Sequence, residues 1–373
     1  MIVDEFHAKR LLDRAGVATP QGQVVRTAGE AAQVARAWGG AAAVKALIPS
    51  GGRGIAGGVR VCADLREVRQ AARSLLGREL LGQRVSALLV EQVVAAEREL
   101  YAAVVVNATT GLIELMVSLA GGVDVEAAAS GLARLAVEPG HVLPVHRVGR
   151  WLEGAGLEGV DQGALAETLV RLYRAAADLD ALLLEVNPLA VAAGALIALD
   201  CKLEVDDNAL PRQAELAALQ RASLEPRELR AREIGVSFVP LDGDIAVITS
   251  GAGLGMATLD LLRREGLAPA NFLDTGGGIS EALVRAALEL VMEPPGVRGA
   301  LVNLYGGINR MLEAARGIAR ALEGRPGGRP VVVKILGNQQ EEAWALLETV
   351  PDVHLVRTVQ TEAAVARLRA LVG

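Results

Sequence analysis

Residues 41–61 read AAAVKALIPSGGRGIAGGVRV: an apolar run that contains a lysine, a glycine-rich loop and a second strand-like run. Five glycines and two arginines fall within residues 50–61. Glycine is costly to order and adds little to a core, so this density indicates a backbone that approaches something closely. The second run continues as a strand where a dinucleotide-binding fold would begin a helix, and the GxxxxGK[ST] motif is absent.

Lys45 and Arg53 suit this stretch to a polyphosphate ligand. Backbone N–H groups of a glycine loop can converge on phosphate oxygens while the two cations neutralise their charge. A glycine-rich hairpin between two strands explains the motif equally well when the motif is taken alone. The stretch therefore predicts two strands joined by a loop, with or without a phosphate site.

The composition narrows the class of protein. The chain has 373 residues, more than one hydrophobic core normally supports, so we expect two or three domains. Aromatic residues make up 2% and the net charge is −6, which counts against nucleic acid as a partner. The longest apolar runs, such as residues 188–199, are too short to predict a membrane span.

The first residues and the cysteines predict a reducing compartment. The opening MIVDEFHAKRLL is charged from the fourth residue and has no apolar secretory segment, so we expect a cytoplasmic protein. Cys62 and Cys201 lie far apart and lack CxxC spacing, which indicates small buried residues rather than ligands or nucleophiles.

The last third of the chain alternates between apolar runs, glycine loops and amphipathic helices. IAVITS (245–250) precedes GAGLGM, ANFLD (270–274) precedes TGGG, and GALVNLY (299–305) precedes GGIN. Such units form right-handed βαβ crossovers, so we expect a flavodoxin-like or Rossmann-like parallel sheet from about Ile234 onward. The three glycine loops should meet at its carboxyl edge, where open α/β folds bind ligands.

The first two-thirds of the chain is less regular. Residues 1–16 predict an amphipathic helix that ends at Gly16, and Thr27 with Glu30 predicts a capping box at the start of a second helix. The charged, proline-containing residues 206–233 predict a domain boundary. Strands are predicted at the short runs AAAVKAL, VRVCA, VSALLVEQVV, ELYAAVVVNA and LIELMVSLA.

Two further runs predict a metal site. In LLLEVNPLAV, Glu185 and Asn187 are two apart on an expected strand, so they share one face. LIALDCKLE places Asp200 in a second expected strand, and pairing of the two strands would bring the three side chains together. Magnesium prefers a few protein oxygens plus phosphate oxygens, so we favour a magnesium site. A buried ion pair with Lys202 is the structural alternative.

Taken together, these segments resemble the β subunits of succinate–CoA ligases almost from end to end. The resemblance implies an α/β protein in which an ATP-grasp module precedes a flavodoxin-like (Rossmann-like) parallel-sheet CoA-ligase domain. We therefore expect an ATP-grasp domain of two subdomains over residues 1–225 and the ligase domain over residues 226–373. The motifs that carry the resemblance are DEFHAKRLLDRAGVATP, AVKALIPSGGRGIAGGVRV, LVEQVVAAERELY, GGVDVE, LEVNPL, ALDCKLEVDDNAL, GAGLGMATLDLL, PANFLDTGGG and LVNLYGGINR.

The resemblance also implies roles for the residues at matching positions. Glu185 is similar to the catalytic glutamate that contacts a phosphohistidine delivered by a partner chain. The implied magnesium ligands are Asn187 and Asp200. The implied nucleotide-binding residues, of which Val94 contributes only its backbone, are Lys45, Gly52, Arg53, Gly54, Glu91, Val94 and Glu99. The implied substrate-binding residues are Ser250, Gly307, Ile308 and Asn309.

The implied activity needs a second chain. In this family an α subunit carries the phosphorylated histidine and binds CoA, and the complex is an αβ heterodimer or heterotetramer. The implied reaction joins a small dicarboxylic acid, succinate, to CoA with Mg2+ and ATP (or GTP), through the phosphohistidine. This chain's own histidines, none of which suits that role, are His7, His141, His146 and His354.

Several positions depart from the family pattern and keep two alternatives open. The family usually carries a histidine at Pro49 and a lysine at Ile55, so we expect weaker nucleotide binding. Ser250 replaces an asparagine, which suits a bulkier or hydroxylated acid, and Met311 and Leu312 replace a Cys-Asp pair. The alternatives are a malate–CoA ligase β subunit, which GINR and DDNAL also resemble, and a non-catalytic nucleotide-binding paralogue.

Overall fold

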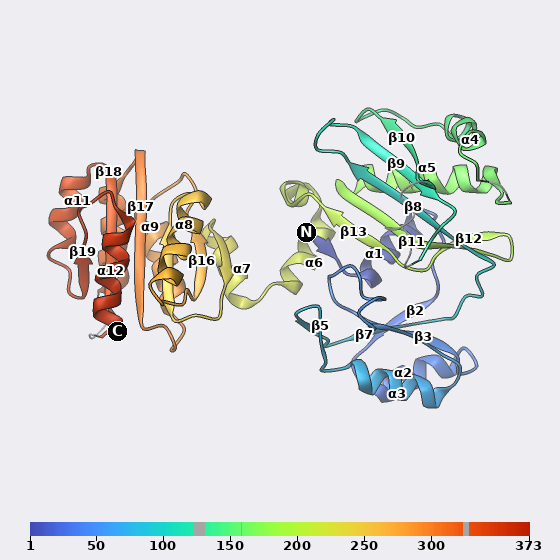
Figure 1. Ribbon diagram of the computed structural model, residues 1–373, viewed down its shortest axis with the longest axis horizontal. Helices are drawn as coiled ribbons and strands as arrows, with labels where there is room; N and C mark the ends of the chain where they lie inside the picture. The colour runs from blue at the N-terminus through green and yellow to red at the C-terminus, as the bar shows by residue number, and fades with distance from the viewer. Residues whose placement is uncertain (123–130, 158, 324–327) are drawn as a thin grey trace. The chain divides into compact units, whose positions relative to one another are not determined.

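The computed structural model describes residues 1–122, 131–157, 159–323 and 328–373. The chain divides into two compact units, Met1–Gln220 and Arg221–Gly373, which Figure 1 shows in blue to green and in yellow to red. The division falls within residues 206–233, where the sequence predicts a boundary. These residues form the 3₁₀ helix η2 (Asp207–Arg212) and the helices α6 (Ala214–Ser223) and α7 (Pro226–Ile234).

The first unit contains a seven-stranded sheet with the order β1-β13-β11-β8-β9-β10, and β12 pairs with β11. Its named strands pair antiparallel throughout. The strands predicted at ELYAAVVVNA and LIELMVSLA are confirmed as β8 and β9. The bounds are β1 (Ile2–Val3), β8 (Arg98–Val106), β9 (Ile113–Ser118), β10 (Ala133–Val137), β11 (Ala181–Ala192), β12 (Ala195–Ala198) and β13 (Lys202–Val205).

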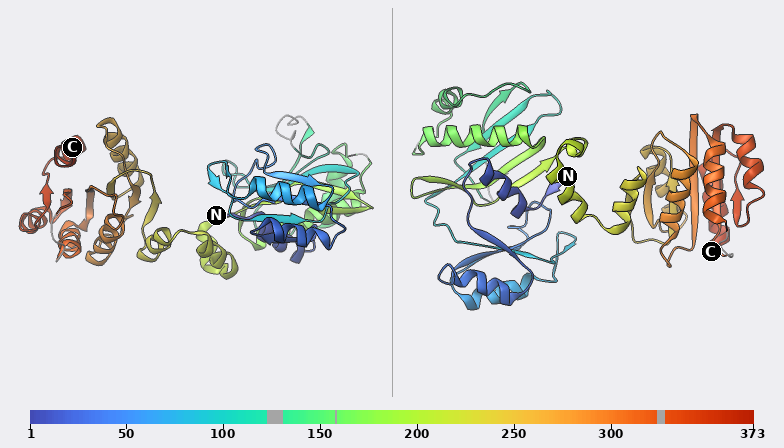
Figure 2. Two further views of the ribbon diagram at one scale, coloured as in Figure 1. Left: turned by 90° about the horizontal axis from the view of Figure 1, so that it is seen from below. Right: turned by 180° about the vertical axis from the view of Figure 1, so that it is seen from behind.

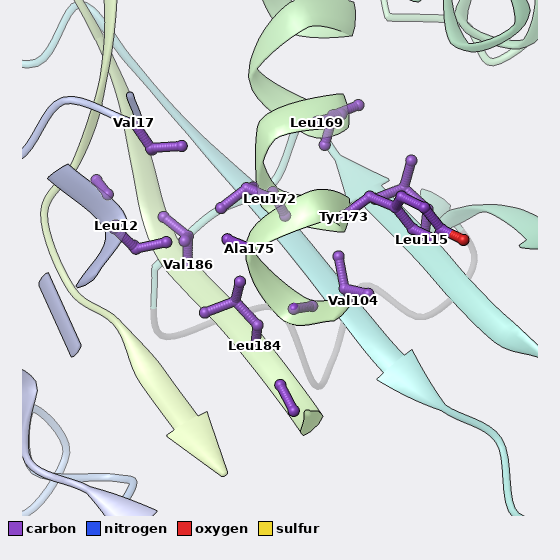
Figure 3. Packing of buried hydrophobic residues seen from close by; sticks show 14 of the residues in the cluster. Leu12, Val17, Val104, Leu115, Leu169, Leu172, Tyr173, Ala175, Leu184 and Val186 are labelled. Atoms are coloured by element: carbon purple, nitrogen blue, oxygen red, sulfur yellow. The ribbon is translucent and has the colours of Figure 1, made fainter. Parts of the chain in front are cut away.

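Helix α5 packs against β8 and β11 of this sheet. Leu165, Leu169 and Leu172 follow the i, i+4, i+7 spacing that places apolar side chains on one helical face, and all three are fully buried. Figure 3 shows Leu172 of α5 next to Val186 of β11. The helices of this part are α1 (Glu5–Arg14), α4 (Val145–Glu153) and α5 (Gln162–Asp178).

A smaller four-stranded sheet has the order β2-β7-β3-β4, and its pairings are also antiparallel. Helices α2 and α3 lie side by side against it (Figure 2). Their alanine, valine and leucine side chains pack on the sheet. The glycine loop of residues 47–58 joins β3 to β4, so the predicted pair of strands is confirmed. The bounds are β2 (Gly22–Val25), α2 (Ala28–Arg36), β3 (Ala42–Ala46), β4 (Val59–Cys62), α3 (Leu65–Leu75) and β7 (Leu88–Glu91). A two-stranded sheet of β5 (Glu79–Leu80) and β6 (Gln83–Arg84) follows α3.

The opening of the chain differs from the single helix that the sequence predicts. Residues 2–3 form β1, and α1 begins only after Asp4, whose carboxylate accepts a hydrogen bond from the His7 backbone N–H. The helix ends at Arg14, and Gly16 follows with a φ of 81°. The prediction of one helix over residues 1–16 was wrong at its start, because pairing with β13 holds the first residues extended.

The second unit is built on a six-stranded sheet with the order β14-β16-β15-β17-β18-β19. Strands β15 to β19 run parallel, and β14 pairs antiparallel with β16 at the edge. The parallel strands therefore have the flavodoxin-like order 2-1-3-4-5, which confirms the predicted fold of this unit. The bounds are β14 (Ser237–Pro240), β15 (Ile245–Thr249), β16 (Asn271–Asp274), β17 (Gly299–Arg310), β18 (Val331–Asn338) and β19 (Val353–Leu355).

Helices cover both faces of this parallel sheet, as the near-continuous apolar strands require. Helices α8 and α12 pack over one apolar cluster, and α9, α10 and α11 pack over another. The bounds are α8 (Ala252–Arg264), α9 (Glu281–Met292), α10 (Met311–Leu322), α11 (Gln340–Leu347) and α12 (Thr361–Val372). Across the part of the chain that the structure describes, no helix is both long and apolar enough to cross a membrane.

Candidate functional site

Six charged side chains from separate parts of the first unit meet in one cluster. The cluster holds three cations and three carboxylates, so its formal charges balance. Five of the six residues are at least 93% buried, and the sixth, Asp200, has a side chain that is 33% exposed. The members, called the charge cluster below, are Glu5 and Lys9 of α1, Lys45 of β3, Arg53 of the glycine loop, Glu91 of β7 and Asp200.

Lys45 reaches the cluster from β3. Its Nζ lies 2.8 Å from Glu5 Oε1 and 2.7 Å from Glu91 Oε2, and it donates a 2.6 Å hydrogen bond to the carbonyl oxygen of Leu199. Burial by itself would lower the pKa of Lys45, but the carboxylates of Glu5, Glu91 and Asp200 outweigh it and hold the pKa above its usual value. The side chain is therefore a fixed positive charge.

Arg53 links the glycine loop to Asp200. Its Nη1 lies 2.8 Å from Glu5 Oε2 and its Nη2 lies 2.8 Å from Asp200 Oδ1. The loop itself leaves room for a ligand, because a Cβ at Gly52 or Gly54 would meet no other atom within 4 Å. Gly52 also has a φ of 76°, a conformation that glycine adopts without strain. Two cations, an open glycine loop and backbone N–H groups form a surface suited to phosphate.

Glu5 and Lys9 are members of the charge cluster that our sequence reasoning missed. A signal was present: Glu5, Ala8 and Leu12 are spaced i, i+3, i+7, so Glu5 lies on the apolar face of α1, with Lys9 one turn further along. Burial would raise the pKa of Glu5, but Lys45, Lys9 and Arg53 outweigh it and hold that pKa far below its usual value. A charged pair on an apolar helix face therefore marked the site.

The strand pairings on either side, Leu189 with Ala198 and Glu185 with Lys202, leave Asn187 and Asp200 at corresponding positions of the predicted hairpin. Strands β11 and β12 pair with Leu189 opposite Ala198, and Leu199 N–H donates a 3.0 Å hydrogen bond to the Pro188 carbonyl. Asp200 itself lies between β12 and β13, so its placement within a strand was wrong. The pairing with β11 is interrupted after Ala198. It resumes from Lys202, which lies opposite Glu185.

The two predicted metal ligands carry side-chain oxygens, the donor type that magnesium prefers. The Asn187 amide is paired with the Gly122 backbone: Oδ1 accepts a 2.6 Å hydrogen bond from Gly122 N–H, and Nδ2 donates a 3.1 Å one to the Gly122 carbonyl. Asp200 Oδ1 accepts hydrogen bonds from Arg53 and from the Cys201 N–H. Burial and Glu5 raise the pKa of Asp200, while Arg53, Lys45 and Lys9 oppose that shift. No group of three or more His, Cys, Asp or Glu side chains in the described residues could hold a metal. A cation here would complete its shell with phosphate and water, which is how magnesium usually binds.

The other predicted nucleotide residues lie at two places. Glu91 is buried between Lys9 and Lys45, with its oxygens 2.7 Å from each Nζ. Val94 is half-buried in the link between β7 and β8, and Glu99 is exposed on β8. A Cβ at Gly122 would lie 3.1 Å from Glu99 Oε2. Glu99 thus lies beside Gly122, the hydrogen-bond partner of one predicted metal ligand, Asn187.

The predicted substrate residues all lie in the second unit, where Ser250 contacts the strand that carries the other three. The Ser250 hydroxyl donates a 3.0 Å hydrogen bond to the Tyr305 carbonyl and accepts a 2.9 Å one from the Tyr305 N–H. Asp274 Oδ1 accepts hydrogen bonds from the N–H groups of Gly251 and Gly276, so the three glycine loops are joined at the carboxyl edge. This edge is where ligands bind in such sheets.

Residues 307–309 lie in strand β17 and not in the glycine loop that the sequence predicts at GGIN. Strand β17 continues through them to Arg310, with a register shift after Gly306, and α10 begins at Met311. The strand can continue because β18 runs beside it: a Cβ at Gly337 would lie 1.9 Å from the Gly306 carbonyl oxygen. Ile308 is 93% exposed, whereas Asn309 is half-buried and has no hydrogen bond within the described residues.

The histidines and cysteines take no part in either site. His7 Nδ1 lies 2.6 Å from Asp4 Oδ2 at the start of α1, and His354 of β19 lies near Arg367. Cys62 and Cys201 are free and buried, as predicted, and burial raises the pKa of both thiols.

Family models match both units of the chain. The model of the ATP-grasp domain matches residues 2–191, and the model described as CoA-ligase matches residues 248–363. These matches confirm the order of the two predicted folds. The parallel sheet of the second unit lies largely within the range of the second match.

Similar proteins cover the whole chain. The β subunit of a GDP-forming succinate–CoA ligase from Thermus thermophilus is 38% identical in an alignment of 379 positions, which covers 100% of this chain and 99% of that protein. The β subunit of an ADP-forming succinate–CoA ligase from Chloroflexus aurantiacus is also 38% identical, over 98% and 99% of the two chains. A solved ATP citrate lyase from Methanothrix soehngenii has the same fold, with a TM-score of 0.77, 19% identity and 99% coverage of both chains.

Proposed function

The chain belongs to the family of succinate–CoA ligase β subunits, and from that premise we propose that it is the nucleotide-binding chain of a nucleoside-diphosphate-forming acid–CoA ligase. The proposed reaction converts succinate, CoA and ATP (or GTP) into succinyl-CoA, the nucleoside diphosphate and phosphate. One observation carries the proposal: Arg53 of the glycine loop touches Asp200, and Lys45 touches the adjacent Leu199 carbonyl. The phosphate-binding cations thus meet the metal-ligand hairpin.

The chemistry of the reaction explains why such a site is needed. A carboxylate is a poor acyl donor because its oxygen leaves badly, so a phosphoryl group must activate it before the CoA thiol can attack. The protein's part in phosphoryl transfer is mainly positioning and charge neutralisation. Lys45, Arg53 and the N–H groups of the glycine loop would supply both around the phosphates. A magnesium ion held by Asn187 and Asp200 would neutralise further phosphate charge.

A partner α subunit would supply the phosphorylated histidine and the CoA site. In this proposal Glu185, on β11 two residues before Asn187, contacts that phosphohistidine. The glycine loop that follows Ser250 and the end of strand β17 at Gly307–Asn309 would hold the acid. The αβ pair, or a heterotetramer of two such pairs, would be the complete enzyme.

Phosphoryl transfer to the partner tests the proposal directly. The chain is purified with an α-like partner and incubated with ATP or GTP labelled on the γ-phosphate, with magnesium. We expect acid-labile label on one histidine of the partner, and no label when that histidine is replaced by alanine or when the chain carries Lys45→Met. Nucleotide binding without any transfer would contradict the proposal and would favour a non-catalytic nucleotide-binding paralogue.

A hydroxylated dicarboxylate such as malate is the second candidate substrate. The Ser250 hydroxyl is engaged with the Tyr305 backbone, while the Asn309 amide has no hydrogen bond within the described residues. An amide with free donors and an acceptor suits a hydroxyl group on the acid. Steady-state rates of the αβ pair with succinate and with malate decide between them. A kcat/KM at least tenfold higher for malate would establish the second candidate.

A further inference from the structure

Lys9 and Lys45 duplicate each other's contacts within the charge cluster. The Nζ of Lys45 contacts Glu5 Oε1, the Glu91 carboxylate and the Leu199 carbonyl, at 2.6 to 2.8 Å. The Nζ of Lys9 contacts the same three groups, at 2.5 to 2.8 Å. Each buried acceptor therefore has two ammonium partners where one would satisfy it.

This duplication matters because leaving a buried carboxylate without a partner is costly. In the proposed function Lys45 must turn at least one of its N–H donors to the nucleotide phosphates. If Lys45 were their sole partner, this movement would leave the buried carboxylates of Glu5 and Glu91 without a cation beside them. Lys9 stays on α1 with all three of its donors engaged, so it can keep both carboxylates paired.

We propose that Glu5 and Lys9 form a fixed ion pair whose role is to release Lys45 and Arg53 to the nucleotide phosphates. This inference rests on the proposed function of the site, and neither residue is among the positions carried over from the family. Glu5 and Lys9 are thus positioning residues: they contact the cations and carboxylates, and those groups contact the ligand.

Arg53 is positioned by the same pair. Its guanidinium is divided between Glu5 Oε2 and Asp200 Oδ1, at 2.8 Å each. The contact to Glu5 Oε2 is ionic and poorly aligned, because that oxygen has no well-directed hydrogen bond within the described residues. When Asp200 takes up a cation, Glu5 remains as the anchor of Arg53. A loosely aligned anchor leaves the guanidinium free to turn toward phosphate.

Each variant changes the balance between cations and carboxylates in the charge cluster in a different way. Lys9→Met leaves two cations against three carboxylates, so Lys45 must stay with Glu5 and Glu91 and the site repels polyphosphate. Glu5→Gln leaves three cations against two carboxylates, so phosphate binding is preserved while Arg53 loses an anchor. The double variant restores the balance of charges, two against two.

Nucleotide affinity of the purified chain with its partner tests the proposal. The probe is a non-hydrolysable ATP analogue with magnesium, followed by titration calorimetry. We expect Lys9→Met to weaken binding at least tenfold, and Lys9→Met with Glu5→Gln to recover at least threefold of that loss. Arg10→Met, which removes an exposed cation from the same helix, is the matched control and should bind within twofold of the unmodified chain.

Two results would overturn the inference. One is a Lys9→Met variant that binds like the unmodified chain, and the other is a double variant that binds more weakly than Lys9→Met. If Lys9→Met does not fold, the Glu5→Gln variant tests the inference instead. We expect its affinity for the ATP analogue to stay within threefold of the unmodified chain and its phosphoryl transfer to be at least tenfold slower. A tenfold loss of affinity in Glu5→Gln would contradict the inference. Failure of the unmodified chain to bind the probe would instead count against the proposed function.

Discussion

At the scale of single residues, the first unit keeps six charges where a core would ordinarily hold none. A buried ion network adds little net stability, because desolvation offsets most of its attraction, but removing one member is costly. The charged groups that lose their hydration on folding are those of the charge cluster. They include Arg53 of the glycine loop and Asp200 of the predicted hairpin. Such clustering is typical of a site kept for its chemistry rather than for stability.

Glu5 predicts how stability changes with pH. Its pKa in the folded protein is held far below the usual 4.5 by Lys45, Lys9 and Arg53, although burial opposes them. Ionised Glu5 therefore stabilises the fold above pH 4.5, and that contribution is lost as the pH falls through the folded pKa. We expect the loss to reach about 1.4 kcal/mol per pH unit below 4.5.

Thermal unfolding between pH 3 and 6 checks this prediction. The melting temperature of Glu5→Gln should be lower at pH 6 but should fall less steeply toward pH 3, because the glutamine has no proton to gain. If the melting temperatures of the two proteins change with pH in parallel, ionised Glu5 does not stabilise the fold as its contacts indicate.

At the scale of secondary-structure elements, α5 is the main support of the sheet that carries the metal-ligand hairpin. Its apolar face packs on β8 and β11 (Figure 3). Strand β11 bears Glu185 and Asn187. Burial of such a face, rather than helix propensity, supplies most of the stability of a helix in a protein.

Leu169→Ala should therefore destabilise the protein by about 2–5 kcal/mol, the range for a leucine removed from a close-packed core. Arg174→Ala alters an exposed position on the same helix and should change the unfolding free energy by about 0.5 kcal/mol or less. Urea denaturation of both variants measures the difference. Equal midpoints would mean that the leucine site collapses without a cavity.

Strands β17 and β18 approach each other closely at Gly337, and this contact is a second feature at the level of secondary-structure elements. Gly337 has a φ of 135°, and a Cβ there would overlap the Gly306 carbonyl oxygen at 1.9 Å. Gly337→Ala should cost about 2 kcal/mol or more and displace residues 307–309. Gly277→Ala, where a Cβ meets nothing within 4 Å, is the control and should melt close to the unmodified protein. A Gly337→Ala variant that melts with the control would contradict this packing.

At the scale of the whole molecule, binding of the nucleotide should raise the stability of the chain. A ligand that binds only the folded state stabilises it by about 2.7 kcal/mol at one hundred times its Kd. We expect ATP with magnesium to raise the melting temperature, and excess EDTA to remove much of that gain. Asp200→Asn should lower the gain from magnesium while keeping part of the gain from the nucleotide. If neither ATP nor GTP shifts the melting temperature, the result would argue against the proposed nucleotide site.

Local patterns predicted the fold of the second unit well, because its parallel strands are apolar runs and its helices carry an amphipathic period. β1 and β14 were missed: two or four residues at a sheet edge show no clear period. Asp200 was misplaced because β12 and β13 are separated by a break that apolar residues on both sides conceal. The apolar face of α1 marks Glu5 as a buried charge, but its partners Lys45 and Arg53 lie about 40 or more residues away in sequence, so the local pattern does not identify them.

The pairing of β1 with β13 sets the order of events during synthesis. Ile2 lies opposite Glu204, so the first strand of the sheet waits for a partner made some two hundred residues later. A ribosome must have released the chain beyond Val205 before α1 can be fixed beside the hairpin. Until then Glu5 and Lys9 remain hydrated, which spares the growing polypeptide from burying charges whose counterparts have not yet been translated.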